Sequence, residues 1–319
     1  MVMKVFVRII AVCVCVGLLV SGIALLLPGR ALADNNARDY IPAPSGVLAV
    51  LWYYEHVSAD RLNAKGKKVT GNLGLTENIG IFRPIYYCDT PAIGPIPSIR
   101  IAPQAVIPFG QASFDGSVFS DVSSSGFAPP FFLSQFWFIN NPKTKTYLGF
   151  APFFFLPIGN YTSTRPINLG QNRWQFRQEL NFTQGFEVIP GHFAYAEVTV
   201  AGQEFTTNND YAGTTLSQHP EFDVESHLSY DITKTVFAAV DYYGHFLGSQ
   251  TVAGVDLNNP INSNSIGGTL AYSFAPGFQL MFQYRGDVSV ENGPKTNIFL
   301  VRFLWATDVN SLIGKVTKP

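Results

Sequence analysis

The chain has 319 residues, with 21 Lys and Arg against 22 Asp and Glu, so its formal net charge is −1. This balance gives no electrostatic basis for binding nucleic acid. Charged residues make up only 13% of the sequence, about half the fraction usual in soluble domains, while aromatic residues reach 14%. The composition therefore favours a protein whose outer surface lies in an apolar environment.

The N-terminus has the layout of a secretory signal peptide. Lys4 and Arg8 precede an apolar run over residues 9–27, and a small-residue site ending at Ala33 is followed by polar residues. We predict a signal peptide over residues 1–33, cleaved after Ala33. The alternative is an uncleaved anchor, because about 20 apolar residues can span a bilayer.

The mature chain would keep a single cysteine. Cys13 and Cys15 lie in the signal peptide, which leaves Cys88 without an internal disulfide partner and without a metal-binding CxxC pattern. We predict no metal and no cofactor.

Residues 34–45 are predicted to form an N-terminal periplasmic segment. A plug inside a barrel could come from these residues or from residues 115–125.

Segments of alternating polarity follow. Residues 46–54 are apolar at even and odd positions alike. Residues 72–82 have apolar side chains at odd positions, and residues 98–109 repeat that pattern. An aromatic run over residues 131–138 comes after a loop rich in Ser, Gly and Pro. Successive side chains of a strand point to opposite faces, so these segments predict strands, with the apolar faces turned outward.

A long hairpin over residues 147–186 shows the pattern most clearly. Trp174, Phe176, Leu180 and Phe182 lie at even positions of its second arm. The odd positions are polar or charged: Arg173, Gln175, Arg177, Glu179, Asn181 and Thr183. In a soluble sandwich the apolar face would meet a core, whereas in an outer-membrane barrel it would meet lipid while the polar face lines the lumen.

Further strands are predicted at residues 191–204, 220–230, 236–246, 266–274, 278–288 and 297–305. One of them carries Glu221, Asp223, Glu225 and His227 on a single face. Carboxylates side by side repel unless water or cations screen them, which favours a wet lumen.

The connections alternate between short and long. Short ones lie at residues 231–234 and 275–277, and long polar ones at 160–172, 206–218 and 248–264. Membrane barrels keep short turns on the periplasmic side and long loops outside. We therefore predict an all-β fold, a single antiparallel transmembrane β-barrel of about 12 strands over residues 46–306, in the outer membrane of a Gram-negative cell. Residues 307–319 are predicted to be a C-terminal tail.

One motif in the hairpin points to a family. Its residues are Pro157, Gly159, Asn168, Gly170, Asn172, Trp174 and Phe176. They resemble the signature of the phenol meta-pathway degradation family of outer-membrane transporter-like proteins. The resemblance implies that the transported compounds are phenols or related aromatic or hydrophobic molecules.

We predict a passive channel or uptake protein without enzyme activity. The side chains expected to face the lumen and line the solute path are Arg173, Arg177, Glu179, Glu221, Asp223, Glu225, His227, Arg285 and Asp287. Expected partners are outer-membrane lipid, small hydrophobic or aromatic solutes and the barrel-assembly machinery. The alternatives are a structural barrel with a plugged lumen, a secreted soluble β protein, and an enzyme using His227 and Ser229, which would need that pair to face lipid.

Overall fold

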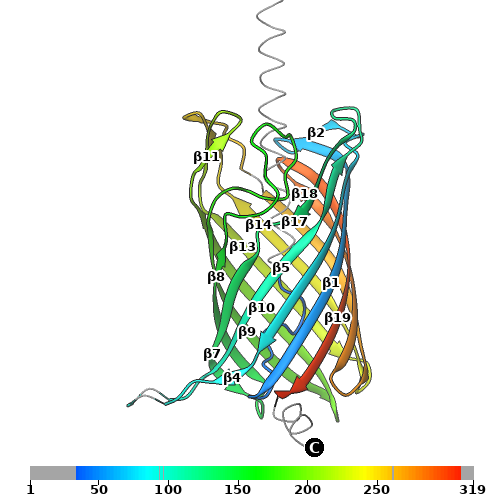
Figure 1. Ribbon diagram of the computed structural model, residues 1–319. Coiled ribbons are helices and arrows are strands. Elements are labelled where there is room, and N and C mark those ends of the chain that lie inside the picture. The colour runs from blue at the N-terminus through cyan, green and yellow to red at the C-terminus, as the bar shows by residue number, and fades with distance from the viewer. Residues whose placement is uncertain (1–33, 93, 96, 261, 310–319) are drawn as a thin grey trace, which may run out of the picture.

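The computed structural model describes residues 34–309 except 93, 96 and 261. The predicted signal peptide and residues 310–319 of the predicted tail lie outside this part. The described chain forms a closed antiparallel barrel with tilted strands (Figure 1). Its twelve wall strands are β1 (Val47–Ala64), β3 (Leu75–Tyr86), β5 (Arg100–Phe114), β7 (Phe131–Asn141), β8 (Thr146–Phe155), β9 (Gln175–Ile189), β10 (His192–Phe205), β13 (Glu221–Asp231), β14 (Val236–Leu247), β17 (Asn262–Ala275), β18 (Phe278–Val290) and β19 (Gly293–Asp308).

The first and last wall strands close the ring. β1 and β19 pair in antiparallel register from Val47 opposite Asp308 to Asn63 opposite Gly293. The last strand thus continues to Asp308, two residues past the predicted barrel boundary at residue 306. Within the described residues, no helix is long and apolar enough to cross a membrane.

Short strands extend the two ends of the barrel. β2 (Lys67–Thr70), β4 (Cys88–Asp89) and β6 (Val122–Phe127) add to the wall, while β11 (Asn208–Tyr211), β12 (Thr214–Gln218), β15 (Gln250–Val252) and β16 (Val255–Asp256) form a separate sheet. The β4 extension and the separate sheet lie at opposite ends of the barrel in Figure 1, where β4 is at the bottom and β11 at the top.

The predicted alternation of connections is confirmed. The turns at residues 231–234 and 275–277 lie at the end where β1 begins and β19 ends, which the rule for membrane barrels makes periplasmic. Residues 160–172, 206–218 and 248–264 lie in or beside the loops at the other end, which is then extracellular. Two connections depart from the rule among those described. β18 and β19 are joined by a short extracellular turn, and residues 87–99, which contain β4 and are described except for 93 and 96, form a long connection at the periplasmic end.

The outer face is apolar, as the alternation predicts. Trp174, Phe222 and Phe282 are 41%, 49% and 41% exposed on the outside of the ring. Exposed aromatic and aliphatic side chains cover the neighbouring strands in the same way. A soluble sandwich would bury these side chains between two sheets, so the ring and its exposed apolar belt exclude that alternative.

A charge placed on this belt is expected to destabilise the protein according to its depth. Phe182 projects outward from the middle of β9, and Val188 projects outward near the periplasmic end of the same strand. We expect Phe182→Arg to cost about 2–4 kcal/mol and Val188→Arg about 0–1 kcal/mol, because lipid solvates a charge worst at the bilayer midplane. Urea unfolding in lipid vesicles measures both values. Equal costs would contradict a lipid-facing β9.

The inner face is divided into two unlike halves. Inward side chains of β1, β3, β5, β7 and β8 are mainly apolar and form one buried cluster, here called the apolar wall. Inward side chains of β9, β10, β13, β14, β17 and β18 are mainly polar or charged and form the polar wall. The outward orientation predicted for the apolar side chains of residues 72–82 is therefore wrong. Leu75, Ile79 and Ile81 are buried inside, because the interior of this half is itself apolar.

Candidate functional site

Residues 34–45, here called the N-terminal plug, occupy the barrel interior. Ala37 and Tyr40 are 0% and 1% exposed, and the chain leaves the interior at the periplasmic end to begin β1. The prediction of a periplasmic segment is therefore wrong for these residues, and the alternative of a plug is right. The other candidate plug, residues 115–125, instead leads into β6, which pairs with β5 and extends the wall.

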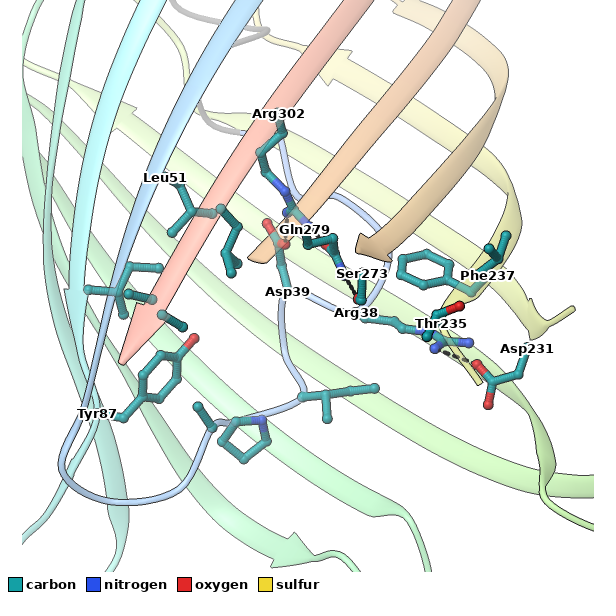
Figure 2. A pocket seen from close by; sticks show the side chains of 18 of the residues that line it. Arg38, Asp39, Leu51, Tyr87, Asp231, Thr235, Phe237, Ser273, Gln279 and Arg302 are labelled. Atoms are coloured by element: carbon teal, nitrogen blue, oxygen red, sulfur yellow. Dashed lines mark hydrogen bonds and ion pairs between the residues drawn. The ribbon is translucent and has the colours of Figure 1, made fainter. Parts of the chain in front are cut away.

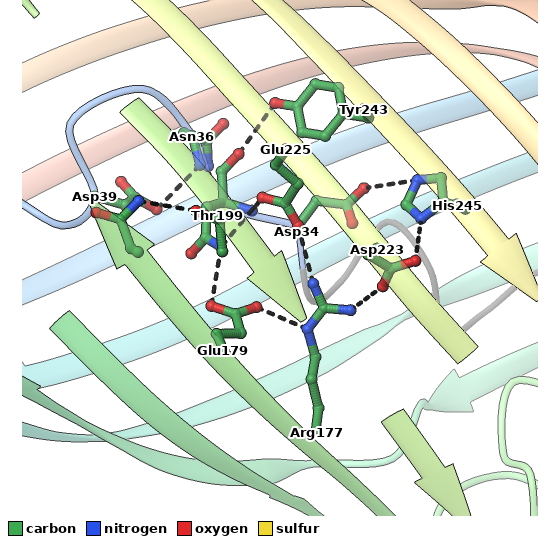
Figure 3. A network of polar contacts seen from close by, with 12 residues as sticks. Asp34, Asn36, Asp39, Arg177, Glu179, Thr199, Asp223, Glu225, Tyr243 and His245 are labelled. Atoms are coloured by element: carbon green, nitrogen blue, oxygen red, sulfur yellow. Dashed lines mark hydrogen bonds and ion pairs between the residues drawn. The ribbon is translucent and has the colours of Figure 1, made fainter. Parts of the chain in front are cut away.

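Hydrogen bonds hold the plug to the polar wall (Figure 3). The Asn35 backbone N–H donates to Glu225 at 2.9 Å, and the Asn35 side-chain amide donates to Glu179 at 3.0 Å. The Tyr40 hydroxyl donates to the same Glu179 carboxylate at 2.8 Å. Farther toward the periplasm, the backbone N–H of Arg38 donates to both oxygens of Glu197. These carboxylates therefore bind the plug.

Ion pairs strengthen the same attachment at three points. Asp34 pairs with Arg285 at 2.6 Å, Arg38 with Asp231 at 2.7 Å, and Asp39 with Arg302 at 2.7 Å. Burial by itself would raise the pKa of the Asp39 carboxyl, but the positive charges of Arg302 and Arg83 hold that pKa below its ordinary value. Asp39 is thus a carboxylate at neutral pH.

The plug also meets the apolar wall. The indole N–H of Trp137 donates to the Tyr40 carbonyl at 2.8 Å. Gly149, on the neighbouring strand, leaves room for the Tyr40 ring, because a Cβ at this position would lie 2.7 Å from the ring atom Cδ1. Tyr40 therefore joins the two walls, with its ring against β8 and its hydroxyl on Glu179 of β9.

Arg177 is the centre of the polar wall. Its guanidinium binds Glu179 at 2.7 Å, Glu225 at 2.9 Å and Asp223. Asp223 in turn lies 3.0 Å from the Nδ1 atom of His245. Alternation along β9 and β13 places all these side chains on one face, and the pairing of both strands with β10 brings them within reach of each other. The result is a buried network in which one guanidinium binds three carboxylates.

The residues predicted to line a solute path face inward, but most are already paired. Arg173, Arg177, Glu179, Asp223, Glu225, His227 and Arg285 are all buried. Glu221 and Asp287 are only half-buried; Glu221 accepts from Gln218 at 2.5 Å and Asp287 from Ser265 at 2.5 Å. Whether solutes pass along this face stays a prediction, since its charges hold the plug and each other.

Sequence reasoning missed several members of the network. The side chains of Glu197 and Asp241 are buried and point into the barrel. Both stand at odd positions, as do the other inward polar residues of their strands, so the alternation of polarity could have identified them. Asp34 and Asp39 carried no such signal, because they precede the first strand and their partners Arg285 and Arg302 lie in β18 and β19.

His227 and Ser229 do not face lipid. Both are buried inside, where His227 Nδ1 lies 2.7 Å from Asp241 and the Ser229 hydroxyl accepts a hydrogen bond from Arg38 at 3.0 Å. Ser229 therefore contacts the plug directly, whereas His227 is held by Asp241 of the neighbouring strand. No cluster of His, Cys, Asp and Glu able to hold a metal ion occurs in the part of the chain that is described.

The motif residues build an extracellular loop that folds over the apolar wall. Ile167 and Leu169 of this loop are 0% exposed and belong to the apolar cluster. Asn168 fixes the fold by donating to the carbonyls of Thr162 and Arg165, each at 3.1 Å. Of the other motif residues, Pro157, Gly159, Gly170 and Asn172 lie in the same loop. Trp174 and Phe176 belong to the outer belt, where their rings stack in parallel with centroids 6.3 Å apart.

Gly170 is expected to be needed for this loop conformation. A Cβ at Gly170 would lie 3.0 Å from the carbonyl carbon of Gly159, so Gly170→Ala must push the two segments apart. We expect amide exchange over residues 160–171 to accelerate about tenfold or more, equivalent to about 1–3 kcal/mol of lost local stability. Gly202→Ala is the matched control, because that position has open space. Unchanged exchange in Gly170→Ala would show that the close approach is not required.

An apolar pocket opens on the outer surface where β5 changes partner. β5 pairs with β7 as far as Val106 opposite Phe131, and with β6 from Phe109 onward. Pro129 and Pro130 separate β6 from β7, because proline has no N–H to continue a ladder. The wall pocket left there has a volume of about 760 Å³. Its lining includes Ile107, Phe127, Phe132, Leu156 and Ile158.

Two further cavities lie inside the ring. An inner cavity of about 20 Å³ lies between part of the plug and the apolar wall. Val106 and Phe131 line this inner cavity and also the wall pocket. A periplasmic pocket of about 350 Å³ lies below the plug between Arg38, Asp39 and the ends of the wall strands (Figure 2). The plug thus has a cavity on each side.

A closed antiparallel barrel with an exposed apolar belt has the architecture of an outer-membrane barrel. The chain belongs to the family described as the putative MetA-pathway of phenol degradation, whose model matches residues 59–303. The resemblance seen in the motif is thereby confirmed. No curated protein matches the sequence.

A solved structure shares the fold. The crystal structure of an outer membrane channel from Pseudomonas putida F1 matches with a TM-score of 0.80 and 22% identity, over 86% of this chain and 100% of that one. The translocator domain of the autotransporter NalP from Neisseria meningitidis has a TM-score of 0.45 and 9% identity, over 88% of this chain and 92% of that one.

Proposed function

We propose that the protein mediates passive uptake of small hydrophobic, in particular aromatic, molecules across the outer membrane. The observation that carries the proposal is the division of the lumen. The charges of the polar wall are taken up by the plug, whereas the apolar wall lies beside an apolar pocket that opens outward. Membership of a family described by phenol degradation supports the same class of solute.

A route follows from the order of the cavities. A hydrophobic molecule dissolved in the outer leaflet reaches the wall pocket without crossing water. Val106 and Phe131 separate it there from the inner cavity, and the periplasmic pocket lies on the far side of the plug. Movement of the Phe131 side chain and of the plug would complete the passage, and diffusion needs no energy source.

A variant that fills the wall pocket tests this proposal. Fluorine NMR of fluorotoluene in lipid nanodiscs, with empty nanodiscs as the blank, detects a saturable protein-bound fraction. We expect Ala105→Phe, which places a ring in the pocket, to abolish that fraction, and Ala238→Phe, on the outer face of β14, to keep it. Absence of saturable binding to the unaltered protein, or equal binding to both variants, would refute the proposal.

The second candidate is a structural barrel with a permanently plugged lumen. The several ion pairs between the plug and the wall favour it. Saturable binding of apolar solutes distinguishes the two, because a purely structural barrel has no reason to bind them.

A further inference from the structure

Two carboxyl groups project into the apolar wall. Glu55 of β1 and Glu77 of β3 are 1% and 2% exposed. The register sets Glu55 opposite Ile79 and Glu77 opposite Val57, so the two side chains are diagonal neighbours on the inner face. Among the described residues, no hydrogen-bond partner reaches either oxygen of Glu55 or the Oε1 atom of Glu77.

The buried acids of the polar wall differ from this pair. Glu179, Asp223 and Glu225 all bind Arg177; Glu179 and Glu225 also bind the plug, and Asp223 also binds His245. Arg285 does not neutralise Glu55 by direct contact, since its guanidinium pairs with Asp34 at 2.6 Å. A buried polar group without a partner is costly, so it marks a place where a partner is expected to bind.

The position of Glu55 says what that partner can be. Glu55 lines the inner cavity together with Val106 and Phe131, the two residues that also line the wall pocket. The rest of the lining on this side includes Leu133 and Phe153. A molecule coming from the wall pocket would therefore have its apolar body against aromatic rings and its polar group against a carboxyl.

We propose that Glu55, with Glu77 as its diagonal neighbour, binds the polar group of the transported molecule, which is an apolar molecule bearing one hydrogen-bond donor, either a hydroxyl or an ammonium group. This assignment rests on the proposed function and defines its solute class. Anionic molecules of the same size are rejected, because Glu55 lines the inner cavity and Glu77 is a second buried carboxyl diagonal to it.

Four ring-fluorinated probes of nearly equal size separate the possibilities. Fluorine NMR in nanodiscs compares fluorinated toluene, benzyl alcohol, benzylamine and benzoate, each corrected for partition into empty nanodiscs. We expect the alcohol or the amine to bind about tenfold or more tightly than toluene, as a hydrogen bond to a carboxylate implies, and benzoate to bind weakest. Preference for the amine over the alcohol identifies the ammonium as the recognised donor, and the reverse preference identifies the hydroxyl.

Glu55→Gln tests the role of this side chain. We expect the variant to lose about tenfold or more of the preference for the best donor over toluene, while its affinity for toluene itself stays the same. Its unliganded stability should be equal or higher, because an unpaired buried carboxyl has been removed. Glu204→Gln, on the exposed face of β10, is the matched control and should change neither quantity.

Each outcome is decisive. If toluene binds as tightly as both donors, or if Glu55→Gln keeps the full preference, the assignment of Glu55 is wrong although the proposed function stands. A lower stability of unliganded Glu55→Gln with unaltered selectivity would make Glu55 a structural residue. If no probe binds saturably, toluene included, the proposed function fails together with the assignment.

Discussion

Deletion of residues 35–41 is expected to turn the closed barrel into an open pore. These residues carry the contacts of the plug to Glu179, Glu225 and Glu197. Without them the carboxylates of the polar wall would be hydrated, and the interior of a twelve-stranded ring is wide enough to hold water beside its side chains. We expect single-channel conductance in planar bilayers to rise about tenfold or more, with small sugars entering proteoliposomes.

Replacement of the same seven residues by a Gly/Ser stretch of equal length separates plug chemistry from chain length. We expect this variant to conduct like the deletion, because it lacks the hydrogen bonds and ion pairs rather than the backbone. Conductance unchanged in both variants would mean that the extracellular loop, through Ile167 and Leu169, closes the lumen without the plug.

Arg177→Met is expected to destabilise the folded barrel by about 3–5 kcal/mol. The variant leaves Glu179, Asp223 and Glu225 without the cation that binds all three, and each is at most 4% exposed at its side chain. Methionine fills a similar volume, so the loss reports the unpaired charges rather than a cavity. Urea unfolding in vesicles gives the free energy, and the temperature at which the gel mobility changes gives an independent ranking.

Removal of the carboxylates in the same chain provides the control. The quadruple variant Arg177→Met, Glu179→Gln, Asp223→Asn and Glu225→Gln removes the guanidinium together with all three of its carboxylate partners and should recover most of the lost stability. Failure of this recovery would show that Arg177 acts through packing, and a loss below about 1 kcal/mol in the single variant would show that water reaches the cluster.

Much of the architecture was readable from alternation. The phase of Trp174, Phe176, Leu180 and Phe182 against Arg173, Arg177 and Glu179 correctly assigned the outer and inner faces of β9. Connection lengths then assigned the two ends of the barrel. Both signals are local, because a strand shows its two faces over a few residues and a turn shows its length directly.

The inner surface could not be read in the same way. Alternation in residues 72–82 shows two faces but not which one meets lipid, and the apolar one faces inward because neighbouring strands build an apolar interior there. The plug is a second failure with another cause. Asn35 and Glu225 are 190 positions apart, and no periodicity connects a polar segment before the barrel with carboxylates on distant strands. For the same reason Glu55 was not singled out, since only the closed ring shows that its carboxyl has no partner among the described residues.

The inward direction of the plug decides where the protein can be labelled. The Asp34 side chain lies against Arg285 inside the ring, so an affinity tag or epitope joined directly ahead of it would begin in the lumen, hidden from antibodies and resins and competing with the carboxylates for space. The extracellular turn between β15 and β16, where Ala253 and Gly254 are exposed, offers an insertion point outside the lumen.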